Sequence, residues 1–207
     1  MHVHSRKPII ILVAYCTLVG LWSLLSPLDF TTWVFEIFFG VVGVAVLALT
    51  FRKCRFSNMV YVLVAIHFTV LALGAKYTYA DMPAFNWLRD EFGLARNYFD
   101  RVGHFMQGFV PAMIARELLL RKFDIKRGKF LFFLVTSICL AISAFYEFIE
   151  WWMVIVFYPE AGMQWLGIQG DIWDAQQDML MAFVGAILAQ LLLNKLHDKS
   201  MKKLHGN

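Results

Sequence analysis

Long apolar runs recur through the sequence, each about as long as a helix needs to cross the roughly 30 Å hydrocarbon core of a bilayer. In lipid, an open strand edge would leave backbone polar groups without partners, so segments of this kind cross as helices. We therefore expect an all-α, polytopic transmembrane helical bundle, with residues 1–207 forming a single integral membrane domain. The six expected spans are residues 9–25, 32–50, 59–75, 102–120, 130–156 and 172–193.

The composition excludes an ordinary soluble domain. Hydrophobic residues make up 60% of the chain and charged residues only 16%, which leaves too little polar surface to cover a soluble core. The net charge of +4 does not indicate a nucleic-acid partner, because the Lys and Arg residues stand in short blocks between apolar runs. The three cysteines show no CxxC spacing, which argues against a disulfide framework or a thiolate metal site.

The basic residues predict the orientation of the bundle. If the N-terminus is inside, 15 of the 19 Lys and Arg residues fall in cytoplasmic segments. The four on the other side are Lys76, Arg89, Arg96 and Arg101. Because cytoplasmic segments carry the excess of Lys and Arg, we expect a multi-pass protein of a bacterial inner membrane with both termini cytoplasmic. The first run has no small-x-small cleavage site after it, so we expect an uncleaved span rather than a signal peptide.

The connection between the third and fourth spans, residues 76–101, is the long one. Within it, apolar residues recur on a single helical face while most polar residues lie elsewhere. The residues on that face are Leu88, Phe92, Ala95 and Phe99. This pattern predicts a short interfacial helix over residues 87–99, between spans three and four, that lies on the outer leaflet.

Seven of the 15 acidic residues map to the outer ends of four different spans, and His104 joins them. The acids are Asp81, Asp100, Glu147, Glu150, Asp171, Asp174 and Asp178. Because the third and fifth spans finish outside and the fourth and sixth begin there, residues far apart in sequence come to one depth. Asp100 and His104 are spaced i,i+4, which puts them on one helical face. A lipid-facing carboxylate costs roughly 2.5–3.5 kcal/mol on insertion scales, so we expect these faces to point into the bundle.

The mutual repulsion of so many carboxylates must be offset by cations or by protonation. Arg96, Arg101 and Lys76 neutralise at most three, which suggests a bound divalent metal ion. Carboxylates with one imidazole suit Zn²⁺, Mn²⁺, Mg²⁺, Ca²⁺ or non-haem iron. The expected metal ligands are Asp100, His104, Glu147, Glu150, Asp174 and Asp178, and the expected catalytic residues are Asp171, as general base, and Asp81.

A structural interpretation of the same acids stays open. Asp171 and Asp174 could cap the sixth helix, while Asp100 and Asp81 could pair with the cations nearest to them. His67, in the middle of the third span, is either a buried histidine that hydrogen-bonds to a neighbouring helix or a residue that relays protons.

Four motifs resemble the YjdF-type family of bacterial inner-membrane proteins. They are residues 77–83 (YTYADMP), 96–111 (RNYFDRVGHFMQGFVP), 146–151 (YEFIEW) and 169–178 (QGDIWDAQQD). The resemblance covers nearly the whole chain and includes the acids and the histidine described above. It implies a multi-span inner-membrane protein and implies no particular reaction.

We expect one of three functions from this pattern. The first is a metal-dependent enzyme that acts on a lipid or lipid-linked substrate at the periplasmic face, with membrane lipid as its partner. The alternatives are a cation- or proton-coupled transporter and a non-enzymatic scaffold. Transport would need polar residues that continue through the bundle to the cytoplasm, and between the acids and the cytoplasmic side the sequence has only a few. They are His67, Gln107, Thr136, Ser137 and Ser143.

Overall fold

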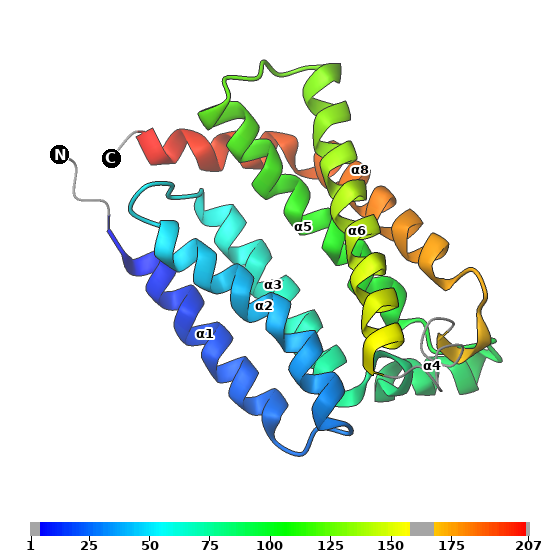
Figure 1. Ribbon diagram of the computed structural model, residues 1–207. Helices are drawn as coiled ribbons and strands as arrows, with labels where there is room; N and C mark the ends of the chain where they lie inside the picture. The colour runs from blue at the N-terminus through cyan, green and yellow to red at the C-terminus, as the bar shows by residue number, and fades with distance from the viewer. Residues whose placement is uncertain (1–4, 158–167, 206–207) are drawn as a thin grey trace.

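The computed structural model describes residues 5–157 and 168–205, and within these residues the chain is all-helical, as predicted (Figure 1). The α-helices are α1 (Lys7–Leu24), α2 (Phe30–Thr50), α3 (Asn58–Tyr77), α4 (Pro83–Phe92), α5 (Phe99–Lys122), α6 (Lys129–Phe157) and α8 (Asp174–His205). Two 3₁₀ turns, Tyr79–Asp81 and Ile168–Gly170, precede α4 and α8. The described residues form no strand.

Five of these helices, α1, α2, α3, α6 and α8, are long and apolar enough to cross a membrane. They correspond to five of the six expected spans. The last differs in length: we expected it to end at residue 193, but α8 continues to His205. The expected fourth span, residues 102–120, lies inside α5, which is not apolar enough to count as a span by composition.

The polar character of α5 follows from its position at the centre of the bundle. It packs against α3, α6 and α8, so much of its surface faces protein. Asp100, Arg101, His104, Arg116 and Glu117 are all buried on this helix. A helix shielded by its neighbours can carry charged side chains that would be unfavourable against lipid.

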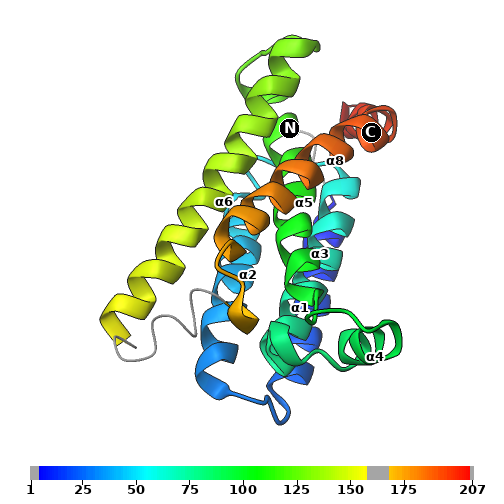
Figure 2. The same cartoon turned by 90° about the vertical axis from the view of Figure 1, so that its right-hand side faces the viewer.

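Small residues bring α5 and α8 into close contact. A Cβ atom added to Gly108 would lie 1.8 Å from the Ala182 carbonyl oxygen, and one added to Gly185 would lie 2.2 Å from the Phe105 carbonyl oxygen. The two backbones therefore touch where they cross, as small residues allow in membrane bundles. Figure 2 shows the two helices crossing. This contact fixes the start of α8 beside the start of α5.

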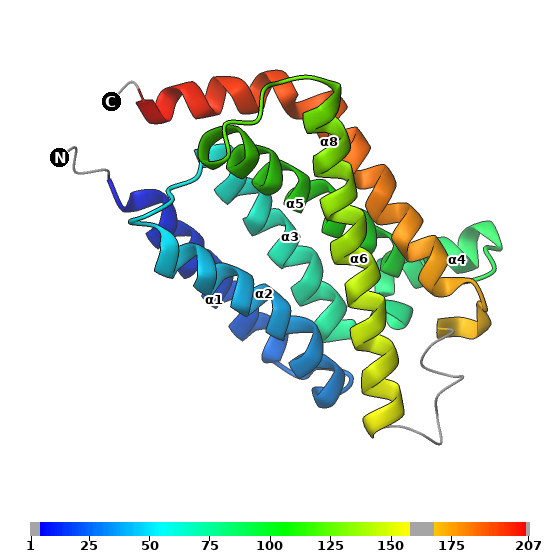
Figure 3. The same cartoon turned by 45° about the horizontal axis from the view of Figure 1, so that its top comes forward.

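The long helices form two groups. In the first, α1, α2 and α3 pack together, and in the second α5 packs with α6 and α8; α3 also packs on α5 and joins the groups. Figures 1 and 3 show this arrangement, with the start of α1 and the end of α8 at the same end of the bundle. The acids gather at the opposite end, near α4.

Helix α4 is shorter than the amphipathic helix that we expected over residues 87–99. It spans Pro83–Phe92 and ends at Gly93, whose left-handed backbone (φ 61°) closes the last turn. Ala95 therefore lies outside the helix, and Phe99 is the first residue of α5. Figures 1 and 2 show α4 lying across the end of the bundle, at an angle to the long helices.

Candidate functional site

The starts of α5 and α8 bring together three of the expected ligands. Asp100 and His104 lie one turn apart on α5, and Asp178 lies on α8 opposite them. One ligand atom from each residue lies within 4.8 Å of the other two. All three side chains are at least nine-tenths buried. We call Asp100, His104 and Asp178 the central group.

Two buried arginines bind the aspartates around the central group. The Arg101 guanidinium donates to Asp174 (2.7 Å), Asp171 (3.1 Å) and Asp100 (3.2 Å), and it also contacts Asp178. Arg96 donates to the same Asp174 oxygen at 2.7 Å and to Asp171 at 3.3 Å. Four aspartates thus share two guanidinium groups, which bind carboxylates more strongly than a neutral donor would.

Lys76 does not contribute to this network. Its ammonium group donates to the Leu25 carbonyl oxygen and lies 5.3 Å from the centre of the Trp22 ring. Of the three cations expected to neutralise the acids, only Arg96 and Arg101 do so. This leaves more carboxylates than cations at this end of the bundle.

The two ring nitrogens of His104 contact different residues. Its Nε2 atom lies 3.5 Å from Asp100 Oδ1 and 3.7 Å from Asp178 Oδ1. Its Nδ1 atom lies 3.2 Å from Gln107 Oε1 and 3.7 Å from Glu147 Oε1. Because the Gln107 amide oxygen can only accept, a proton on Nδ1 satisfies that contact. In that tautomer the Nε2 lone pair faces the two aspartates.

Glu147 and Glu150 on α6 have no Lys or Arg partner among the described residues. Glu147 Oε1 is buried and has no hydrogen-bond partner there. Its side chain is 10% exposed, and Oε1 lies 3.7 Å from His104 Nδ1. A buried carboxylate oxygen in this state is unfavourable unless a proton or a cation reaches it.

Asp171 lies at the rim of the network and is partly exposed. Its Oδ2 atom accepts from Gln177 at 2.9 Å as well as from both arginines. Its pKa lies below the ordinary value of 3.8, first because the Trp173 backbone N–H donates to Oδ1, and then because of Arg101 and Arg96. A carboxylate held ionised in this way is a weak general base.

The structure does not bring Asp81 to the other acids. It is exposed in the turn before α4, and its side chain accepts a hydrogen bond from Thr78 at 3.4 Å. Of the expected metal ligands, Asp174 is in the arginine network. Glu147 and Glu150 face the central group from α6.

A cavity of about 430 Å³ extends from the central group between α2, α3, α5 and α6. Its polar end contains Asp100, His104, Gln107 and Glu150, together with Glu36, Tyr79 and Tyr146, which we did not anticipate from the sequence. Tyr146 lies within hydrogen-bonding reach of Glu36. Glu36 stands about one turn into the second span, at the outer end, so the topology that grouped the other acids could have found it.

The rest of the cavity is apolar. Its walls include Phe39, Val44, Leu47, Val64, Phe68, Leu71, Val110 and Ile114. His67 also lines it, and the buried His67 Nε2 atom has no hydrogen-bond partner among the described residues. The interpretation of His67 as a histidine bonded to a neighbouring helix therefore gains no support from Nε2.

Comparison with known proteins agrees with the resemblance seen in the motifs. A family model described as "Predicted membrane protein (DUF2238)" matches residues 8–199. The inner membrane protein YjdF of Escherichia coli (strain K12) is 37% identical over 201 residues, which cover 96% of each chain. No solved structure matches the chain. Together with the apolar helices, these matches identify a multi-pass inner-membrane protein.

Proposed function

This chain belongs to the DUF2238 family of predicted membrane proteins, and we propose that it is a metal-dependent enzyme that acts on a lipid or lipid-linked substrate. One observation carries the proposal: two residues of the central group, Asp100 and His104, line the polar end of an otherwise apolar cavity. An occupant that matches both ends has a polar head and a hydrocarbon chain. Lipids are the class of membrane molecule with this chemistry.

We place six spans in the bilayer, the five apolar helices and α5, within one integral membrane domain. At 1.5 Å per residue, the 24 residues of α5 reach about 36 Å, which is enough to cross. Both termini are cytoplasmic in this placement, which leaves the acids at the periplasmic face and follows the distribution of Lys and Arg. Helix α4 then lies on the outer leaflet, where the exposed Trp87 and Phe92 side chains meet lipid.

The central group has the donors that a divalent metal ion requires. Two carboxylates and one imidazole suit Zn²⁺, Mn²⁺, Mg²⁺ or Fe²⁺. Ligand atoms within 4.8 Å of one another can be spanned by one ion with bonds of about 2.0–2.6 Å. Gln107 accepts from Nδ1 of His104, an arrangement that orients metal-ligating histidines in other proteins.

The other three expected ligands lie in two places, on α6 and in the arginine network. Glu147 and Glu150 lie on the α6 side and could complete the coordination or accept protons. Asp174 accepts from both arginines at 2.7 Å and is not among the residues whose ligand atoms lie within 4.8 Å of one another, so we assign it to positioning rather than to the metal.

A bound divalent ion would supply Lewis acidity to a phosphoryl or carbonyl oxygen and make a nearby water molecule more acidic. Arg101 holds Asp100 and Asp178 in fixed orientations. Glu147 Oε1 is placed to accept a proton from such a water molecule, because it is buried beside His104 and has no donor of its own. We assign the general base to Glu147 instead of Asp171, whose carboxylate is already bound by donors.

The cavity has a route to lipid. Helix α2 packs on α1 and α3, whereas α6 packs on α5 and α8, and the cavity lies between these two groups. Val46 of α2 and Ile142 of α6 both line it and are 52% and 45% exposed. A hydrocarbon chain could therefore enter sideways from the bilayer without crossing the polar end.

The metal content of the purified protein tests the proposal. The protein is purified without chelator as wild type, Asp178→Asn, His104→Ala and Asp81→Asn, and its metal is measured by mass spectrometry. We expect about one ion per chain in the wild type and in Asp81→Asn, a matched loss of a carboxylate outside the central group. Asp178→Asn and His104→Ala should lose most of it. Equal, near-zero metal in all four proteins would remove the metal from the proposal.

A second candidate, a proton- or cation-coupled transporter, is favoured by one observation. Buried charged groups lie at both ends of α5, with Asp100 near its start and Glu117 near its end, and His67 lines the cavity between them. Proton uptake by liposomes that contain the protein, abolished by His67→Ala, would favour transport over the enzyme.

A further inference from the structure

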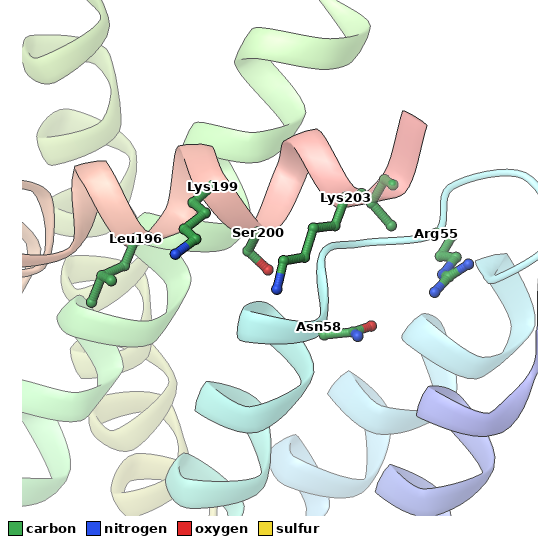
Figure 4. Close-up of a pocket in the computed structure, with 7 residues that line it drawn as sticks. Arg55, Asn58, Leu196, Lys199, Ser200 and Lys203 are labelled. Carbon is green, nitrogen blue, oxygen red and sulfur yellow. The ribbon is translucent and has the colours of Figure 1, made fainter. Parts of the chain in front are cut away.

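A second pocket lies at the opposite end of the bundle from the acids, and it is basic. It has a volume of about 300 Å³, at the lower limit of ordinary ligand sites. Its lining residues are Arg55, Asn58, Leu196, Lys199, Ser200, Lys203 and Leu204. They come from the segment before α3, the start of α3 and the end of α8 (Figure 4). We call this the basic pocket.

The three cations of the basic pocket have no carboxylate partner in the part of the chain that the structure describes. Arg55, Lys199 and Lys203 form no ion pair with any described residue, and the buried Arg55 Nε atom lacks a hydrogen-bond partner there. The acids nearest in the fold are already bound. Glu117 accepts from Arg121 and from the Ser57 backbone N–H, and it contacts His197. The pocket therefore keeps an excess of positive charge.

Two of the other lining residues, Asn58 and Ser200, are polar. Helix α3 begins at Asn58, and the Glu117 carboxylate already accepts from the backbone N–H of its N-cap residue Ser57 at 2.8 Å, so this helix end is not a free donor. Ser200 Oγ accepts from the Met59 backbone N–H at 3.2 Å, which leaves its hydroxyl proton to donate elsewhere. In Figure 4 the Lys203 ammonium group and the Ser200 hydroxyl both point from α8 toward the start of α3.

Contacts with α5 and with the segment before α6 hold the end of α8 in this position. Asp198 accepts from Arg116 at 2.8 Å, and His197 Nε2 lies 3.0 Å from Glu117 Oε2. Arg127, from the segment before α6, also binds Asp198. Lys199 and Lys203 are one turn apart on the face of α8 that lines the pocket, so their placement does not depend on a loose tail.

We propose that the basic pocket binds a phosphate-bearing anion, either the headgroup of an anionic phospholipid or a free phosphate. Three cations without an ion-pair partner among the described residues and one hydroxyl donor line it, and cationic donors of this kind bind phosphate oxygens more strongly than neutral donors do. The basic pocket is separate from the acids at the other end of the bundle. An experiment can therefore refute anion binding here without refuting the proposed enzyme, and the reverse also holds.

The experiment uses the full chain in detergent and two probes. Binding of phosphatidylglycerol, and separately of inorganic phosphate, is measured by thermal stabilisation at constant ionic strength, with phosphatidylcholine and chloride as blanks. The variant Lys199→Gln/Lys203→Gln removes two cations from the pocket. Its matched control, Lys195→Gln/Lys202→Gln, makes the same change of charge on the same helix outside the pocket.

The pocket variant should bind about thirtyfold more weakly than wild type, since each lysine near anionic lipid contributes roughly fivefold. The control should stay within about twofold, and Lys203→Gln alone should lose about fivefold. Stabilisation by phosphatidylglycerol alone assigns the anion as a lipid headgroup, and stabilisation by inorganic phosphate assigns a free phosphate. Equal losses in the two double variants, or no stabilisation of the wild type by either probe, would overturn the proposal.

Discussion

The guanidinium group of Arg101 and the carboxylate of Asp178 form a buried ion pair between residues 77 positions apart, and the pair joins the start of α5 to the start of α8. The two residues are 8% and 3% exposed. Asp178 is also one of the three residues of the central group. The arginine therefore both holds the two helices together and orients an expected metal ligand.

Removal of this arginine should destabilise the protein strongly. In Arg101→Ala the buried carboxylates of Asp100, Asp174 and Asp178 lose their main partner, which should cost roughly 3–5 kcal/mol. Arg89→Ala is the control, because the Arg89–Asp90 pair is exposed and exposed ion pairs contribute little to stability. Unfolding in mixed micelles measures the free energy of unfolding of both variants. Similar small losses of stability in Arg101→Ala and Arg89→Ala would show that the arginine network does not stabilise the fold.

The contribution of Asp171 to stability should depend on pH. Its pKa in the folded protein lies below the ordinary value of 3.8, so the ionised carboxylate stabilises the fold above that value, and the contribution disappears as the pH falls through the folded pKa. Asp171→Asn should have a lower melting temperature than wild type at pH 7, and the difference between the two melting temperatures should shrink as the pH falls below 3.8. A difference in melting temperature that does not shrink at any pH below 3.8 would contradict the contacts with Trp173, Arg96 and Arg101.

The hydropathy of the sequence predicts most of the fold because bilayer thickness fixes the length of each span. It also predicts that Asp100, His104 and Asp178 share one depth, because alternating spans bring the same ends together. Hydropathy does not predict the rotation of each helix about its axis, and this rotation decides which side chains touch. The pairing of Asp174 with Arg96 and Arg101 depends on that rotation.

Helix ends were the least predictable part of the fold. Helix α4 stops at Gly93 because a left-handed residue closes it, although the apolar pattern continues to Phe99. Helix α8 runs past residue 193 because His197 and Asp198 find buried or partly buried partners on α5. The ends of α4 and α8 thus depend on single residues and on tertiary contacts, and the pattern of apolar residues predicts neither.

The close contact between α5 and α8 should tolerate no added methyl group. In Gly185→Ala the new Cβ would lie 2.2 Å from the Phe105 carbonyl oxygen, so the helices must separate, at a cost of about 1–3 kcal/mol. Gly43→Ala is the control, because a Cβ at Gly43 meets no atom within 4 Å, and this change should stabilise the helix by up to about 1 kcal/mol. Effects of the same sign in both variants would show that the helices do not meet at Gly185.

The cavity should lose its occupant when a larger side chain fills it. Gly43 lines the cavity, and a side chain there starts in open space, so Gly43→Leu should fill part of the volume without distorting α2. Val42→Leu enlarges the neighbouring residue, which is 42% exposed and does not line the cavity. We expect native mass spectrometry to detect a tightly bound lipid in the wild type and in Val42→Leu and to find most of it missing in Gly43→Leu.

Metal content should stay the same in all three proteins, because the ligands lie at the other end of the cavity. Equal lipid retention in the two variants would show that the hydrocarbon chain does not enter between α2 and α6, and the proposed substrate class would then have to be abandoned.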